Sequence, residues 1–144
     1  MAEIRKMQES DREVVIGMMR SFYASPCVYT NGSEEIFKAD FDGCVSDSPY
    51  IEGYVFEKDG AIIGYGMIAK SFSTEFGREC IWIEDLYVLD EYRGLGVGSS
   101  FFKFIEESYQ DVIFRLEVEE ENMRARSVYE KNEFDYLPYL EMKK

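Results

Sequence analysis

The chain contains no histidine, and this absence excludes several kinds of chemistry. Catalytic triads with a histidine base and zinc sites with imidazole ligands are both ruled out. Acid–base chemistry would therefore depend on carboxylates, tyrosine, lysine or ordered water. Cysteine is also scarce. The three residues, Cys27, Cys44 and Cys80, are odd in number, far apart and in none of the spacings of metal sites. We expect no resident metal and a reduced, cytoplasmic setting.

Long apolar runs and excess positive charge are missing as well. No run approaches the roughly 20 apolar residues that cross a membrane, and residues 1–6 lack the apolar core of a signal peptide. The 16 basic and 29 acidic residues give a net charge of −13. Such a charge disfavours nucleic acid and anionic membrane surfaces and favours cationic small molecules, although many acidic proteins are simply soluble.

Apolar side chains are abundant. Hydrophobic residues make up 46% and aromatic residues 16% of the 144 residues, which predicts a folded chain with a single domain over residues 1–144. The spacing of apolar residues and turn signals predicts strands at 2–8, 50–58, 61–71, 79–89, 112–118 and 134–142, and helices at about 10–24, 33–46, 97–109 and 123–131. Ser10 and Glu13 fit a capping box that begins the first helix. This order predicts an α/β (α+β) fold, a mixed sheet with helices on its faces.

The stretch from residue 83 to residue 105 joins a predicted strand to a predicted helix through Gly94, Gly96 and Gly98. Glycines let the backbone approach an anion closely, and the amides at a helix N-terminus can converge on it. No lysine follows the third glycine, which excludes a Walker loop, and Ser99 stands where a dinucleotide fingerprint has its last glycine. The stretch is therefore a different phosphate loop, or a tight turn without a ligand.

The run Arg93-Gly94-Leu95-Gly96-Val97-Gly98 resembles the pyrophosphate loop of the GNAT superfamily of N-acetyltransferases. Residues 122–134 resemble the second cofactor motif of that family, with Asn122, Ala125 and Tyr129 in place and Glu133 where glycine is usual. The resemblance covers about residues 80–135. It implies acetyl-CoA as the cofactor and acetyl transfer to an amine in a ternary complex. It also implies a mostly antiparallel sheet, splayed between the strands at about 80–88 and 112–118.

The resemblance also implies roles for individual residues. Tyr129 would donate a proton to the departing thiolate, because a tyrosine hydroxyl is neutral at pH 7, and Glu84 would accept the proton of the amine. The alternatives are that Tyr129 only packs, that Glu84 is structural, that Asn122 only caps a helix and that Arg93 is a solvated surface residue. The cofactor would be held by Leu86, Tyr87, Val88, Arg93, Gly94, Leu95, Gly96, Val97, Gly98, Ser99, Asn122 and Tyr129.

The acceptor amine is less clearly indicated. Glu84-Asp85, Tyr92-Arg93-Gly94 and residues 96–99 are similar to the diamine (spermidine/spermine) acetyltransferase branch, which favours a polyamine. Residues 121–125 depart from that branch, so an amino acid, an aminoglycoside or a protein N-terminus remain open. So do an acyl-CoA sensor without turnover and an interaction module. A homodimer is a further expectation, with the aromatic residues 134–139 either at its interface or closing the sheet.

Overall fold

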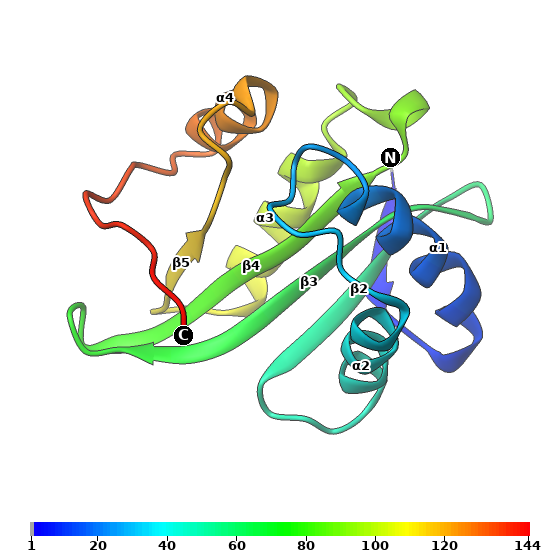
Figure 1. Ribbon diagram of the computed structural model, residues 1–144, viewed down its shortest axis with the longest axis horizontal. Helices are drawn as coiled ribbons and strands as arrows, with labels where there is room; N and C mark the ends of the chain where they lie inside the picture. Colours follow the sequence, from blue (N-terminus) through cyan, green and yellow to red (C-terminus); the bar gives the residue numbers. More distant parts are fainter. Residues whose placement is uncertain (1) are drawn as a thin grey trace.

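The computed structural model describes residues 2–144 and contains one five-stranded sheet (Figure 1). The strands lie side by side in chain order, and the first three pairings are antiparallel whereas β4 and β5 are parallel. The predicted mixed, mostly antiparallel sheet is therefore confirmed. Its strands are β1 (Glu3–Lys6), β2 (Ile51–Lys58), β3 (Ala61–Ser73), β4 (Arg78–Val88) and β5 (Ile113–Leu116).

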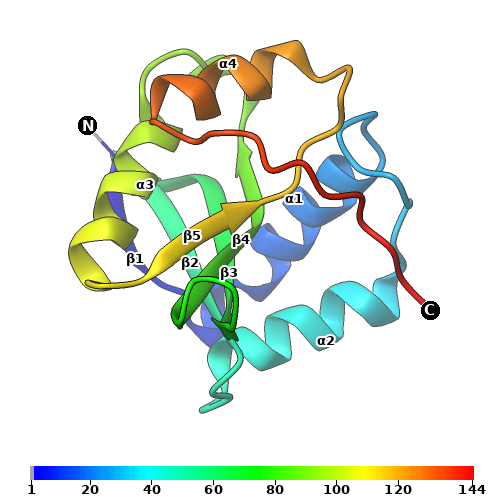
Figure 2. The ribbon, with the colours of Figure 1, turned by 90° about the vertical axis from the view of Figure 1, so that its left-hand side faces the viewer.

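Helices cover both faces of the sheet, as predicted (Figure 2). Two short 3-10 turns, η1 (Glu9–Asp11) and η2 (Asp90–Tyr92), precede α1 and the glycine loop. Two apolar cores result, one between the sheet and α3 and one between the sheet and the pair α1 and α2. Within residues 2–144, no helix is long and apolar enough to span a membrane. The helices are α1 (Arg12–Tyr23), α2 (Glu34–Val45), α3 (Val97–Ser108) and α4 (Met123–Lys131).

A β-bulge interrupts β4 at Glu84. The pairing of β3 with β4 shifts there, because Asp85 lies opposite Met67 and Ile83 lies opposite Ile68, which leaves Glu84 without a partner on β3. A bulge of this kind inserts one residue and reverses the alternation of side chains along the strand.

The reversal is visible in the core on the α3 side. Before the bulge Ile81 and Ile83 belong to that core, and after it Leu86 and Val88 do. Glu84 and Asp85 therefore both belong to the opposite face, which α1 and α2 cover. In a regular strand these two carboxylates would point to opposite faces.

The two parallel strands separate directly after the bulge. The pairing of β4 with β5 ends at Ile83 and Leu116, and the strands diverge beyond it, with α4 beyond the gap (Figure 1). The Leu89 amide donates to the Ile63 carbonyl of β3 at 2.9 Å, so the alternating pattern directs the backbone groups of residues 86 and 88 into the gap. The predicted splay between these strands is confirmed.

The predicted capping box at Ser10 is wrong. The Gln8 amide instead donates to the Asp11 carboxylate at 2.8 Å, and the 3-10 turn η1 precedes α1. Asp11 is buried and pairs with Arg5 at 2.8 Å. This ion pair with β1 orients Asp11 to cap the turn, and the local Ser10 signal does not include it.

The predicted last strand at 134–142 is also wrong, because these residues have no strand partner and run as an irregular tail. Pro138 has no amide to donate. Tyrosine hydroxyls hold the tail instead: Tyr136 donates to Glu130 at 2.8 Å and Tyr139 donates to Glu75. The strand β5 is likewise shorter than the predicted 112–118.

The turn after α4 has the shape that the family motif predicts, despite the missing glycine. Glu133 has φ of 70°, in the left-handed region, and the Phe134 amide donates to the Tyr129 carbonyl at 3.0 Å. This bond is the hallmark of a Schellman C-cap, in which glycine usually occupies the left-handed position. The turn is therefore kept at the cost of a strained residue.

Candidate active site

The glycine loop forms an anion cradle at the start of α3. Gly94 and Gly96 have φ of 78° and 82°, a conformation that glycine adopts without strain. The amides of residues 97–99 lie in the first turn of α3, where no helical carbonyl can accept from them. The Arg93 amide already donates to the Asp90 carbonyl at 3.2 Å. The amides of residues 94–99 are thus the ones suited to hold a phosphate.

The Arg93 side chain braces this loop. Its Nε donates to the Val88 carbonyl at 2.7 Å, and its guanidinium pairs with Asp90 at 2.6 Å and lies over the Tyr87 ring. These three contacts tie the end of β4 to the turn that follows it. The side chain therefore positions the loop rather than reaching toward a ligand.

Arg124 is a cation that sequence reasoning did not single out. A methyl group added at Gly94 would lie 4.0 Å from Nη2 of Arg124, so the guanidinium lies over the glycine loop. The Asn122 side chain caps α4 by accepting from the Ala125 amide at 3.1 Å, and this fixes the first turn that carries Arg124. At the other end of α4, Asn132 donates to the Ser99 hydroxyl at 3.0 Å. The helix and the loop thus form one unit.

A group of carboxylates lies on the α1/α2 face beside the bulge. Asp85 is buried and accepts from the hydroxyls of Tyr65 at 2.7 Å and Tyr23 at 3.0 Å. Burial raises the pKa of Asp85, although the two hydroxyls oppose this effect. On α2, burial and the charge of Asp85 raise the pKa of Asp40 to about 6. The Glu84 side chain is exposed at the surface. Desolvation by the surrounding protein raises its pKa, and the negative charge of Asp85 raises it further.

Two more carboxylates approach from elsewhere in the chain. Glu117, just beyond β5, and Glu141, in the tail, both add to the raised pKa of Glu84. Sequence reasoning missed these two residues and Asp40, because no spacing signal connects three positions so far apart in the chain. Together the carboxylates make this side of the gap attractive to a cation.

Tyr129 lies on α4, the helix beyond the gap. Its ring packs edge-on against Phe102 and Phe134, with ring centroids 5.9 Å and 6.2 Å away. Burial raises the pKa of the Tyr129 hydroxyl, with a further contribution from Cys27 in the loop between α1 and α2. The hydroxyl therefore keeps its proton at neutral pH and can act as a donor. The gap lies between this helix and the bulge that carries Glu84.

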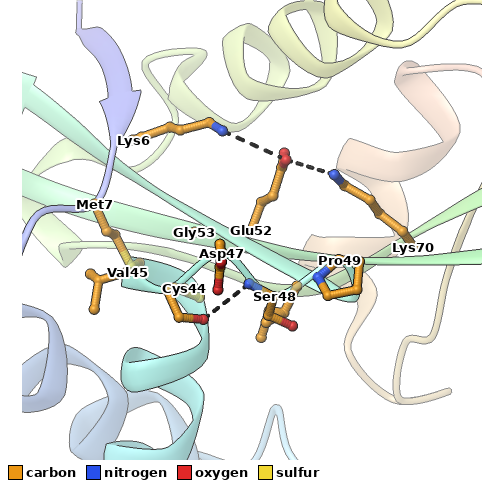
Figure 3. A pocket seen from close by; sticks show the side chains of 12 residues that line it. Lys6, Met7, Cys44, Val45, Asp47, Ser48, Pro49, Glu52, Gly53 and Lys70 are labelled. Carbon is orange, nitrogen blue, oxygen red and sulfur yellow. Dashed lines mark hydrogen bonds and ion pairs between the residues drawn. The ribbon is translucent and has the colours of Figure 1, made fainter.

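A separate cavity, of about 430 Å³, lies where β1, the end of α2 and the start of β2 meet (Figure 3). There Lys6 and Lys70 both approach Glu52, at 3.6 Å and 2.7 Å. Burial opposes ionisation of Glu52, but hydrogen bonds from Lys70, Tyr109 and Tyr54 outweigh it and lower the pKa to about 2. The two lysine ammonium groups and the Glu52 carboxylate therefore pair with one another. None of the predicted site residues lines this cavity, so we place the chemistry at the gap instead.

Comparisons with known proteins agree with this geometry. The Acetyltransferase (GNAT) family profile matches residues 13–134. The thialysine N-epsilon-acetyltransferase of Bos taurus is 32% identical over 139 residues, which span 88% of this chain and 79% of that protein. The corresponding enzyme of Mus musculus is 30% identical over the same shares.

Solved structures share the fold. A "possible acetyltransferase" from Clostridium difficile 630 superposes with a TM-score of 0.83 at 20% identity, over 99% of this chain and 96% of that one. The aminoglycoside N-acetyltransferase AAC(6')-Iy, solved with a CoA bisubstrate analogue, has a TM-score of 0.80 at 14% identity, over 100% and 97% of the two chains. The cradle, the splayed strands and Arg124 fit the pyrophosphate and extended arm of coenzyme A. The chain belongs to the GNAT acetyltransferase family and is an acetyl-CoA-dependent N-acetyltransferase.

Proposed function

We propose that this enzyme acetylates a small cationic primary amine that binds on the α1/α2 side of the gap, with Glu84 as base and Tyr129 as acid. The observation that carries the proposal is the bulge at Glu84. It lies where the pairing of β4 with β5 ends, and it brings Glu84 and Asp85 to the same face beside the opening.

The residues around the gap fit acetyl-CoA. The amides of residues 94–99 would hold its pyrophosphate, and Arg124 would add a positive charge to that site. The backbone groups of Leu86 and Val88 would contact the extended arm, together with Asn122. Acetyl-CoA supplies an acetyl group that is activated as a thioester.

In this proposal, Glu84 acts as the base. An alkyl amine of pKa about 10.4 is almost wholly protonated at pH 7, so its proton must be removed before the nitrogen can attack. The neighbouring carboxylates attract the cation but also favour its protonated form, which makes a base more necessary. A carboxylate with a raised pKa is a stronger base than an ordinary one and suits this step.

In this proposal, Tyr129 acts as the acid. The ammonium proton passes to Glu84, directly or through water, before the nitrogen bonds to the acetyl carbon. As the carbon–sulfur bond breaks, the thiolate takes a proton from the Tyr129 hydroxyl, and the second proton released by the nitrogen restores that hydroxyl through water. The raised pKa of that hydroxyl keeps the proton in place until the thiolate forms.

Several acceptors carry such an amine. The motif likeness to the diamine branch favours a polyamine, whereas the named activity of the Bos taurus relative favours the side-chain amine of an amino acid. Aminoglycosides are a third class, which the named fold neighbour acetylates. All three classes of amine are cationic, and the carboxylates of this face attract a cation.

The test is release of free thiol from acetyl-CoA in the presence of spermidine, short diamines, lysine, ornithine and an aminoglycoside. We expect turnover with at least one of these amines and no comparable release without an amine. Binding of acetyl-CoA, measured by its effect on the melting temperature, is followed in parallel. Stabilisation by acetyl-CoA without turnover on any amine would contradict the proposal.

A further inference from the structure

Arg115 of β5 has hydrogen-bonding capacity that the rest of the chain does not use. Its guanidinium lies 4.6 Å above the centre of the Trp82 ring, and Trp82 is its partner in the β4–β5 register. The buried Nε of Arg115 has no hydrogen-bond partner among residues 2–144. Arg115 also has no ion pair within the described part of the chain, although the sequence has 29 acidic residues.

An unpaired buried donor on a charged group is costly, and native proteins rarely keep one without a reason. Arg5 on β1 shows the usual arrangement, because it pairs with both Asp11 and Glu57 at 2.8 Å. Arg115 has the charge and the planar donor fork but lacks the carboxylate. Stacking on Trp82 holds the fork in one orientation, as a preformed binding site would require.

Arg115 lies on the same face of the sheet as the carboxylates of the active site. Phe114 and Leu116 pack into the core on the α3 side, so the alternation along β5 places Arg115 on the opposite, α1/α2 face. Along β4, Trp82 precedes Glu84 by two residues, which is a distance of roughly 7 Å in a strand. This face therefore carries one unpaired cation close to a group of anions.

This juxtaposition fits a ligand with charges of both signs. We infer that the acceptor is an amino acid whose side chain ends in a primary amine, and that Arg115 binds its carboxylate. The inference rests on the proposed function and names the substrate class of that site. The guanidinium fork matches a carboxylate through two parallel hydrogen bonds, and the amine would extend toward Glu84 at the gap. A diamine has no group that could satisfy Arg115.

The test compares substrates that differ only in the carboxylate. Lysine is measured beside lysinamide and 1,5-diaminopentane, and ornithine beside ornithinamide and 1,4-diaminobutane. In the unchanged enzyme we expect kcat/KM for each amino acid to exceed that for its amide and its diamine by roughly tenfold or more, as for a charged hydrogen bond. Arg115→Gln should raise the KM for lysine by a similar factor, with little change in kcat and in the kinetics of the diamine.

Two further variants keep the result interpretable. Arg115→Lys retains a cation beside Trp82 but not the fork, and should recover part of the preference for the amino acid. Arg78→Gln removes an exposed arginine at the start of β4 and should leave every ratio unchanged. The melting temperature and the KM for acetyl-CoA report whether each variant is folded.

The outcomes distinguish the role of Arg115 from the proposed N-acetylation of small amines. Better turnover with diamines than with amino acids, or equal losses for both classes in Arg115→Gln, would overturn the role of Arg115 and leave the N-acetylation of small amines intact. The absence of turnover with any amine in the folded enzyme would overturn the proposed function, and the carboxylate inference with it.

Discussion

At the scale of single residues, the proposed chemistry of this acetyltransferase depends on two side chains whose surroundings influence their protonation. Tyr129 is packed among Phe102 and Phe134, and burial keeps its hydroxyl protonated. Desolvation and the neighbouring carboxylates raise the pKa of Glu84, which makes its ionised form a stronger base. Each proposed role can be tested by one substitution.

Tyr129→Phe removes the proton donor and keeps the ring. We expect kcat to fall by about 10²-fold, the lower end of the range for general acid catalysis, while the KM for acetyl-CoA changes little. Steady-state kinetics measure both quantities. Tyr50→Phe, at an exposed position, is the control and should change neither. An unchanged kcat in Tyr129→Phe would show that this tyrosine only packs.

Glu84→Gln tests the base through the pH dependence of the rate. Glu84 accepts a proton only when it is ionised, so the rate of the unchanged enzyme should fall as the pH drops through its raised pKa. The variant should have a much lower kcat/KM and should lack this acidic limb. Glu79→Gln, at an exposed position on β4, should keep the normal profile. If Glu84→Gln kept the same profile, another group would be the base.

Asp40→Asn tests whether the ionised carboxylate of Asp40 lowers the stability of the folded protein. The folded-state pKa of about 6 exceeds the ordinary value of about 3.9, so ionised Asp40 lowers stability above pH 6 and has no such effect below pH 4. The substitution should raise the free energy of unfolding by about 1–3 kcal/mol at pH 8 and leave it nearly unchanged at pH 4. Denaturant unfolding at both pH values measures this difference.

The control for Asp40 is Asp42, which lies exposed on the same helix, α2, and pairs with Arg12 of α1 at 2.6 Å. Asp42→Asn should reduce stability slightly at pH 8, by up to about 1 kcal/mol. Equal changes for Asp40→Asn at both pH values would mean that its carboxylate is not strained.

At the scale of elements, the bulge in β4 and the glycine loop after it form two different parts of the proposed site. The bulge aligns Glu84 and Asp85 and coincides with the separation of β5. The loop supplies amides at the start of α3, and Arg93 and Asn132 hold it against β4 and α4. The proposed acceptor side and the proposed cofactor side of the gap are thus built from one continuous segment of chain.

The role of the loop can be separated from simple backbone strain. Gly96 and Gly77 have φ of 82° and 66°, and an added methyl group would meet no atom within 4 Å at either position. Alanine should therefore cost roughly 1 kcal/mol of stability at both sites. Only Gly96→Ala should also raise the KM for acetyl-CoA, by severalfold, because it distorts the cradle. Equal KM values in the two variants would argue against the cradle.

At the scale of the whole molecule, the net charge of −13 should guide the acceptor. A cationic amine is attracted by the acidic face, and dissolved salt screens that attraction. We expect the KM of the acceptor to rise severalfold between about 0.05 and 0.5 M sodium chloride. The KM for acetyl-CoA, an anion, should stay constant or fall. An acceptor KM that is independent of salt would exclude long-range attraction.

Much of this protein is encoded in short stretches of its sequence. The glycine loop and the Asn122 cap depend on residues that are neighbours in the chain, so their patterns predict them. The left-handed turn at Glu133 does not follow from its own residue, because the usual glycine is missing there. The hairpin between β2 and β3 follows in the same way from Asp59 and Gly60. Strands and helices with strong periodicity were also predicted, with their ends displaced by a few residues.

The tertiary structure decided what depends on distant partners. Arg5 made Asp11 the cap in place of Ser10, and hydrogen bonds to Glu75 and Glu130 held the tail that the pattern predicted as a strand. Asp40, Glu117 and Glu141 approach Glu84 from three separate parts of the chain. The unpaired state of Arg115 is visible only when every possible partner has a position. Local conformation can be predicted from contiguous residues, whereas a site defined by charge and burial depends on how the whole chain packs.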